Sequence, residues 1–282
     1  MEGRQLFLAV LVCTVFSFTF YARSADTDAP APIRDRGLIE LWAAGQPAFG
    51  QYVTQMQGGA GSQEPPRYTV QTGRDLAANP LLDFAFLSLE QHYNADSARN
   101  VATGLGSGGE DAAMPLLVRI PPISVDGVDA ARARVQEVLA LGADGVVIPH
   151  VLSAEEARIA ISLFEGVEVW SPDNPDGDVI AMLIVEDPDV FAELEEIASL
   201  PGYSALVCGI GSLTAALNGD REAADAIALE VLAVSQRAGL VDLMTVDTES
   251  VARRVEQGFL ALLAYGPDSD EAIRAGRAAA GR

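Results

Sequence analysis

The chain has 282 residues and a formal net charge of −22, with 40 acidic residues against 18 basic ones. Such an acidic chain argues against nucleic acid and anionic membranes as partners, because both require a basic face. All the basic residues are arginine, so Schiff-base lysine chemistry, lysine-bound pyridoxal phosphate and a P-loop are excluded. The two cysteines, Cys13 and Cys208, are too few for a disulfide framework or a multi-cysteine zinc site.

Residues 1–25 have the pattern of a secretory signal peptide. A charge-free run, LFLAVLVCTVFSFTF, follows Arg4, and Ala22 and Ser24 then stand in the spacing of a cleavage site. The run is short for a membrane span, and a retained N-terminal anchor is the alternative interpretation. We therefore expect an exported protein, periplasmic or secreted, with a flexible lead-in over residues 26–36 and a single domain over residues 37–282.

Eight short apolar runs alternate with amphipathic segments along the rest of the chain. Continuous apolar runs are typical of parallel strands that are covered on both faces. The predicted strands span residues 47–53, 81–89, 114–120, 144–150, 178–186, 204–210, 241–246 and 259–266. Eight strands alternating with helices over about 250 residues predict an α/β fold, a (β/α)8 or TIM barrel. An open doubly wound sheet is the alternative.

Local signals place helix ends and loops between these strands. Gly142 is expected to end the helix after the third strand, and Pro188 suits a first helical turn. Ser153 and Glu156 have the spacing of a capping box. The two polar segments, residues 55–68 and 170–178, are predicted to be loops on the rim of the active-site end of the barrel.

Polar residues near the carboxyl ends of the strands are the candidates for chemistry, because the working face of a barrel lies there. They are Ser88, Glu90, Gln91 and His92 near the end of the second strand, Arg119 in the third, His150 after the fourth, Glu186 and Asp187 after the fifth, and Ser212 after the sixth. These include both histidines of the chain. Each histidine has a functional interpretation and a purely structural one.

Arg119 and Glu186 carry the strongest signals. An arginine at the end of an apolar strand must be paired or face a ligand, because burying an unpaired charge is costly. Its guanidinium suits a carboxylate bound by two parallel hydrogen bonds, and a structural ion pair is the alternative. Glu186 could be a metal ligand, a general base or the partner of Arg119.

The stretch CGIGSLTAAL, residues 208–217, reads as a strand end followed by a glycine turn and a helix. As a dinucleotide or phosphate loop it lacks the third glycine and a matching acidic residue. Ser212 is expected to cap the short helix. The backbone amides of Gly209, Gly211 and Ser212 are candidates for binding a small substrate.

Several segments of the chain together resemble the HpcH/HpaI aldolase/citrate lyase family. They are LIELWAAGQPAFGQYV, LLDFAFLSLEQHYNADSARN, PLLVRIPP, GADGVVIPHVLSAEEAR, LIVED and GYSALVCGIGSLTAALNG. The resemblance covers most of residues 37–282, and its most specific part is residues 142–158. It implies a (β/α)8 barrel, a class II aldolase that uses Mg²⁺ or Mn²⁺ and a pyruvate-type enolate, and assembly into trimers or hexamers.

The resemblance also implies roles for particular residues. Arg119 would bind the carboxylate of the substrate, and Glu186 would be one of two acidic metal ligands. Ser212 stands where the family has the second, an aspartate, and Asp187 is a further candidate ligand. Because a hydroxyl replaces a charged carboxylate, the Mg²⁺ or Mn²⁺ is expected to be weakly bound or absent. The catalytic histidine of the family directly follows a glutamate, whereas here Glu90 precedes Gln91 and only then His92; His92 is expected to replace that base.

These observations predict a metal-dependent carbon–carbon lyase that acts on a 2-oxo acid or 4-hydroxy-2-oxo acid. The alternative is a catalytically degenerate relative that binds a small carboxylate without aldol chemistry, which the Ser88, Gln91 and Ser212 departures suggest. A third hypothesis is an interaction protein whose barrel only supports the loops 55–68 and 170–178.

Overall fold

Eight parallel strands stand at the centre of the structure, a computed structural model that describes residues 36–54, 67–106 and 113–282. The strands are β1 (Ala48–Tyr52), β2 (Phe84–Ser88), β3 (Leu116–Arg119), β4 (Gly145–Ile148), β5 (Ile180–Val185), β6 (Ala205–Cys208), β7 (Leu243–Val246) and β8 (Ala261–Ala264). They are hydrogen-bonded in the order β6-β5-β4-β3-β2-β1-β8-β7, and a parallel bridge between Ala205 and Val241 nearly closes the sheet. The predicted (β/α)8 barrel is therefore confirmed, and the open-sheet alternative is wrong.

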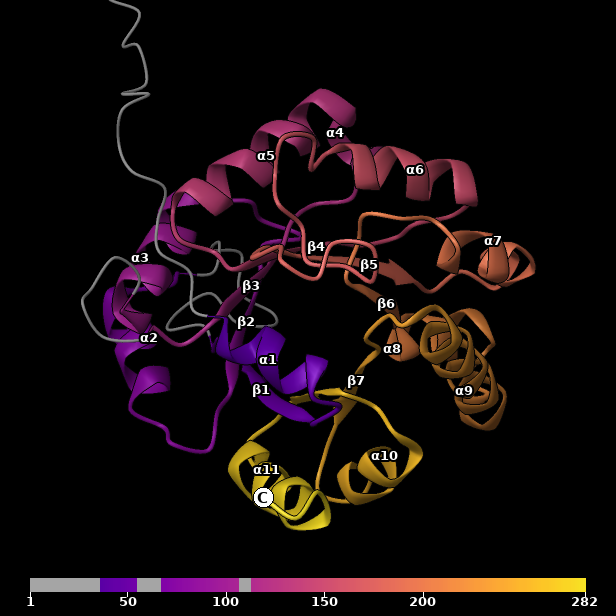
Figure 1. Cartoon of the computed structure of the whole chain (residues 1–282). Helices are drawn as coiled ribbons and strands as arrows, with labels where there is room; N and C mark the ends of the chain where they lie inside the picture. Colours follow the sequence, from indigo (N-terminus) through magenta and orange to yellow (C-terminus); the bar gives the residue numbers. More distant parts are fainter. Residues whose placement is uncertain (1–35, 55–66, 107–112) are drawn as a thin grey trace, which may run out of the picture. The chain divides into compact units, whose positions relative to one another are not determined.

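Helices surround the strands (Figure 1). They are α1 (Gly37–Ala43), α2 (Val70–Ala77), α3 (Ala95–Leu105), α4 (Ile123–Asp126), α5 (Val128–Ala140), α6 (Ala154–Ser162), the 3₁₀ helix η1 (Pro188–Glu193), α7 (Leu194–Ala198), α8 (Ile210–Ala216), α9 (Arg221–Ala238), α10 (Val251–Gln257) and α11 (Ser269–Ala279). Across the described residues, none of these helices has the length and apolar character needed to span a bilayer. The predicted signal peptide, nearly all of the lead-in and most of the loop 55–68 lie outside the described residues.

The strands are apolar on both faces because they serve two separate cores. Inside the barrel, side chains such as Phe84, Leu117 and Met182 pack against one another. On the outer face, side chains such as Leu87 and Val118 pack against the helices. Each fully buried side chain of this size contributes about 1.5–3 kcal/mol of transfer free energy. This double burial explains why the strands read as continuous apolar runs rather than alternating ones.

The amino end of the barrel is covered by α1 together with the segment before β5. Trp42 of α1 stacks on Trp170 with ring centroids 6.1 Å apart, and its Nε1 donates to the Leu260 carbonyl at 2.9 Å. The segment 170–178 precedes β5, so it lies at the end of the barrel opposite the active-site rim. The prediction that it belongs to that rim is wrong, because a loop entering a parallel strand lies at the amino end of the strand.

The predicted helix signals have mixed outcomes. Gly142 follows the end of α5 with φ of +100°, and Pro188 is the first residue of η1, so both predictions are confirmed. The Ser153 hydroxyl accepts from the Glu156 amide at 3.1 Å, as expected. The reciprocal half of the capping box is wrong: the Glu156 carboxylate accepts from the Leu152 amide at 3.0 Å, one residue before the cap.

Helices α2 and α3 approach closely through a pair of glycines, which provides a test of the packing. A Cβ added at Gly104 would collide with the Val70 carbonyl oxygen and lie 2.7 Å from the Gly73 Cα.

Gly104→Ala is expected to lower the free energy of unfolding by about 1–3 kcal/mol, despite the better helix propensity of alanine. Urea unfolding followed by circular dichroism measures the change. Gly211→Ala in α8, where nothing lies within 4 Å, is the control and should be neutral or stabilising; equal behaviour of the two variants would contradict this packing.

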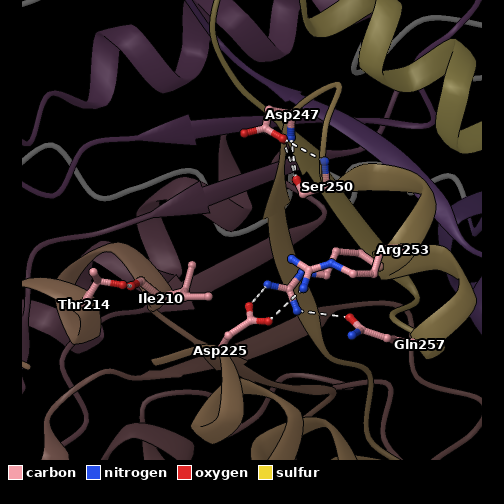
Figure 2. A network of polar contacts seen from close by, with 8 residues as sticks. Ile210, Thr214, Asp225, Asp247, Ser250, Arg253 and Gln257 are labelled. Atoms are coloured by element: carbon pink, nitrogen blue, oxygen red, sulfur yellow. Dashed lines mark hydrogen bonds and ion pairs between the residues drawn. The ribbon is translucent and has the colours of Figure 1, made fainter. Parts of the chain in front are cut away.

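A polar network links α9 to α10 on the outside of β7. Asp225 of α9 pairs with Arg254 and, at 3.0 Å, with Arg253, and Figure 2 shows Asp225, Arg253 and Gln257 around this contact. Arg254 is only 1% exposed; its Nη1 donates to Gln257 at 3.0 Å, and its guanidinium lies 5.5 Å from the centre of the Phe259 ring. These contacts satisfy most of a charge that is otherwise expensive to bury.

Candidate active site

A pocket of about 180 Å³ opens at the carboxyl ends of the strands. Its apolar wall comes from the barrel interior, and its polar atoms come from strand ends and from the start of α8. The lining residues are Tyr52, Phe86, Arg119, Val147, Met182, Ile184, Glu186, Val207, Cys208, Gly209, Ile210, Gly211, Ser212, Leu243 and Thr245. An apolar pocket with a few convergent polar groups is the usual form of a small-molecule site.

Arg119, the last residue of β3, lies between neighbouring polar groups and the pocket. Its Nε and Nη2 donate to the Ser88 hydroxyl at 3.1 and 3.0 Å, and Nη2 also pairs with Glu90 Oε2 at 2.7 Å. Its guanidinium lies 5.9 Å from the centre of the Phe86 ring. The structural ion pair is therefore present, and the same side chain lines the pocket; its contact with a substrate carboxylate stays a prediction.

His150 connects the two glutamates at the mouth of the barrel. Its Nε2 lies 2.7 Å from Glu90 Oε1, and its Nδ1 lies 2.6 Å from Glu186 Oε1. The backbone of His150 has φ of +56°, a region that non-glycine residues seldom adopt and that is common at functional sites. A continuous chain of contacts thus runs from Arg119 through Glu90 and His150 to Glu186.

Glu186 follows β5 and is only 8% exposed. His150 holds one carboxylate oxygen, and the other lies against the backbone of Gly209. A Cβ added at Gly209 would collide with Glu186 Oε2 and lie 2.7 Å from the Glu186 Cβ. Glycine at position 209 therefore leaves room for the glutamate to reach the pocket wall.

Tyr52 is a pocket residue that the sequence analysis missed. It ends β1, lines the pocket and packs edge-on against Phe86 with ring centroids 5.1 Å apart. Burial raises the pKa of Tyr52, and the negative charges of Glu90 and Glu186 add to this effect, whereas Arg119 lowers it. The hydroxyl therefore stays protonated at neutral pH and can donate a hydrogen bond. The rule that found Arg119, a polar residue ending a strand, would also have found Tyr52.

Six candidates from the sequence are not among the residues that line the pocket: Ser88, Glu90, Gln91, His92, His150 and Asp187. Ser88, Glu90 and His150 contact Arg119 or Glu186, whereas the other three lie apart from them. His92 and Gln91 are exposed on the segment between β2 and α3, and neither is among the residues that line the pocket. Asp187 is exposed, and its Oδ1 accepts from the Asp189 amide at 2.9 Å, which caps η1. Of the two histidines, the structure thus brings His150 into contact with the acidic groups of the mouth.

The glycine loop lines the pocket, as the sequence suggested, but its helix begins earlier than expected. Helix α8 starts at Ile210 with Gly209 as its N-cap residue. Ser212 is therefore the third helical residue, and the prediction that it caps the helix is wrong. Gly209, Gly211 and Ser212 all lie on the pocket wall, and binding of a small substrate by their amides stays a prediction.

The donor set of this pocket does not fit a firmly held divalent cation. Glu186 is the one carboxylate among the lining residues, and Ser212 contributes only a neutral hydroxyl. Within the ranges that the structure describes, no three histidine, cysteine, aspartate or glutamate side chains form a metal-binding group. One oxygen of Glu186 is also bonded to His150. The use of Mg²⁺ or Mn²⁺ stays a prediction.

A buried acid behind the pocket wall predicts a pH effect on stability. Asp242, just before β7, is 1% exposed, and neither carboxylate oxygen has a well-formed hydrogen bond within the described part of the chain. Burial raises the pKa of Asp242 well above its ordinary 3.8, although Arg254 and the amides of Leu243 and Cys208 oppose the shift. The folded chain therefore holds this proton more tightly than the unfolded chain does.

Such an acid favours the folded state at low pH, and that contribution is lost as the pH rises from about 3.8 toward the raised value. The stability of the wild type relative to Asp242→Asn is expected to fall across this window. Urea unfolding of both proteins in steps from pH 4 to pH 8 would measure it. A difference that does not change with pH would show that Asp242 is ionised in the folded chain.

No protein-family model and no curated protein sequence matches the chain. Solved structures do match over most of its length. An HpcH/HpaI aldolase/citrate lyase family protein from Burkholderia cenocepacia superimposes with a TM-score of 0.63 at 20% identity, over 86% of this chain and 96% of that one. An HpcH/HpaI aldolase from Desulfitobacterium hafniense gives 0.63 at 22% identity, over 86% and 94%.

Macrophomate synthase superimposes with a TM-score of 0.60 at 17% identity, over 88% of both chains. Identities this low show a shared fold and leave the chemistry to be argued from the site. The family that the sequence resembles is also the family named for the first two structures. The resemblance is thereby confirmed at the level of the barrel fold.

Proposed function

We propose that the chain is an aldolase-type carbon–carbon lyase that acts on a small 2-oxo acid or 4-hydroxy-2-oxo acid. The observation that carries the proposal is the pocket at the barrel mouth, where Arg119, Tyr52 and Glu186 meet on an apolar wall. The aldolases among the structural neighbours support the same class of reaction.

Arg119 would orient the substrate. Its Nη2 and Nε are directed to Ser88 and Glu90, while within the described residues no acceptor meets Nη1. This nitrogen can donate to the carboxylate or the 2-oxo group of a substrate in the pocket. The contacts on the other nitrogens fix the plane of the guanidinium, so little rotational freedom is lost when the substrate binds.

Glu186 is the group best placed to move the proton. In cleavage, its carboxylate would take the proton of the C4 hydroxyl, the C3–C4 bond would break, and an aldehyde would leave. The electron pair of that bond would form the C2–C3 double bond of an enolate, whose C2 oxygen faces Arg119 and the Tyr52 hydroxyl. Return of the proton from Glu186 to C3 would give pyruvate. His150 would hold Glu186 in position throughout.

The test is pyruvate formation from a panel of 4-hydroxy-2-oxo acids, together with exchange of the pyruvate methyl protons in D₂O followed by NMR. We expect pyruvate release and exchange in the wild type and loss of both in Glu186→Gln. Parallel samples with EDTA, Mg²⁺ and Mn²⁺ test the predicted metal dependence. Absence of both reactions under every condition would overturn the proposed lyase.

The second candidate function is binding of a small carboxylate without aldol chemistry. The observation that favours it is that the charged groups of the mouth are already paired with one another, from Arg119 through Glu90 and His150 to Glu186. Calorimetry with pyruvate tests it: binding that EDTA does not change, without turnover, would support this function.

Assembly and location complete the proposal. We propose a homo-oligomer, a trimer or hexamer, because the sequence resembles a family with that tendency. Export, to a periplasm or beyond, is proposed from the signal-peptide pattern of residues 1–25. Light scattering of the purified protein and N-terminal sequencing of the secreted form would test these two points.

A further inference from the structure

We infer that His150 prevents Glu186 from binding a divalent cation. The imidazole is bonded to the carboxylate that would otherwise coordinate an ion at the barrel mouth. The inference concerns binding and holds whether or not the chain is a lyase. It follows from the disagreement between the acidic mouth, which would attract a cation, and the arrangement of its side chains, in which Glu186 Oε1 is bonded to His150 and Oε2 is packed beside Gly209.

One oxygen of Glu186 is bonded to His150, and the other is packed beside Gly209. His150 Nδ1 lies 2.6 Å from Oε1, and Oε2 lies against Gly209, where even an added Cβ would collide with it. Magnesium and manganese are held by one or two carboxylates with waters and substrate oxygens. An ion at Glu186 would therefore have to displace the imidazole or move the carboxylate away from Gly209.

The imidazole is itself held in place. Its Nε2 lies 2.7 Å from Glu90 Oε1, and Glu90 Oε2 lies 2.7 Å from Arg119 Nη2. Turning the ring away from Glu186 would break the contact with Glu90 as well. The left-handed backbone of His150, with φ of +56°, is unfavourable in a non-glycine residue and persists only where the surroundings fix it.

Among the described residues that line the pocket, there is no second carboxylate that could coordinate a cation in place of Glu186. Ser212, on α8, presents a neutral hydroxyl to the pocket, so a cation there would meet one carboxylate at most. The structure thus assigns His150 the role of a positioning residue that keeps Glu186 in its bonded orientation and sets the affinity of the mouth for cations.

The test is Mn²⁺ binding, measured by isothermal calorimetry and by electron paramagnetic resonance at one fixed pH. His150→Gly removes the imidazole and suits the positive φ, so the fold should be kept. We expect it to bind Mn²⁺ about tenfold more tightly than the wild type, or better, the size expected for one charged hydrogen bond. His150→Asn, which also tolerates this backbone but is too short to bridge the glutamates, should show a gain in the same direction.

Two controls assign the gain to Glu186. The double variant His150→Gly, Glu186→Gln should return to the weak binding of the wild type. His92→Gly alters the other histidine of the chain, which is exposed, and should leave the affinity unchanged. Unchanged or weaker Mn²⁺ binding in both folded His150 variants would overturn the inference; weaker binding would mark His150 as a metal ligand. Because the readout is binding, failure of the proposed lyase reaction would leave this result intact.

Discussion

Replacing Arg119 by methionine is expected to lower the affinity for pyruvate by about 10²–10³-fold. The methionine keeps much of the length of the side chain but removes the donors that face the pocket and the contact at 2.7 Å with Glu90 Oε2. Truncating one member of a partly buried charged pair typically costs several kcal/mol, largely because the other charge stays unpaired. Calorimetric titration with pyruvate measures the loss directly.

Arg119→Lys is the matched control for this experiment. Lysine keeps the positive charge but lacks the planar fork that contacts Ser88 and Glu90 at the same time. We expect an intermediate affinity, with thermal unfolding close to that of the wild type. If Arg119→Met folds normally and binds pyruvate as the wild type does, Arg119 is only the structural partner of Glu90, and the substrate role assigned to it is wrong.

Replacing Arg254 by alanine is expected to lower the free energy of unfolding by about 3–5 kcal/mol. The side chain is 1% exposed, bridges α10 to Asp225 of α9 and packs against Phe259. Its removal opens a cavity and leaves the partly buried carboxylate of Asp225 with Arg253 as its remaining ion-pair partner. The result can be followed by urea unfolding, and Figure 2 shows the surroundings of this contact.

The adjacent arginine provides the control. Arg253 pairs with the same carboxylate at 3.0 Å, but its side chain is 55% exposed. Exposed ion pairs contribute about 0–1 kcal/mol, so Arg253→Ala should have a small effect although it removes the same kind of group from the next position. Equal losses for the two variants would show that burial is not what makes Arg254 important.

The sequence predicted the barrel because its physical signals are local. Parallel strands covered on both faces must be apolar throughout, so all eight appear as short apolar runs of the chain. Arg119 and Glu186 were found in the same way, since a charge at the end of such a run has to meet a partner or a ligand. The helix ends at Gly142 and Pro188 also depend only on neighbouring residues.

The remaining features of the site depend on contacts between distant segments. His92 and His150 both follow strands, and only the tertiary structure shows that His150, with its left-handed backbone, joins Glu90 and Glu186 while His92 is exposed. The segment 170–178 lies at the amino end of the barrel because it connects α6 to the start of β5.

By itself, then, the sequence determined the eight strands along the chain and the two charged residues that line the pocket, because burial constrains the residue types of each segment separately. The tertiary structure decided which polar groups are bonded to one another at the mouth. That choice depends on backbone dihedrals, on strand register and on the absence of a Cβ at Gly209, whose place the Glu186 carboxylate fills. None of these can be read from a run of residue types.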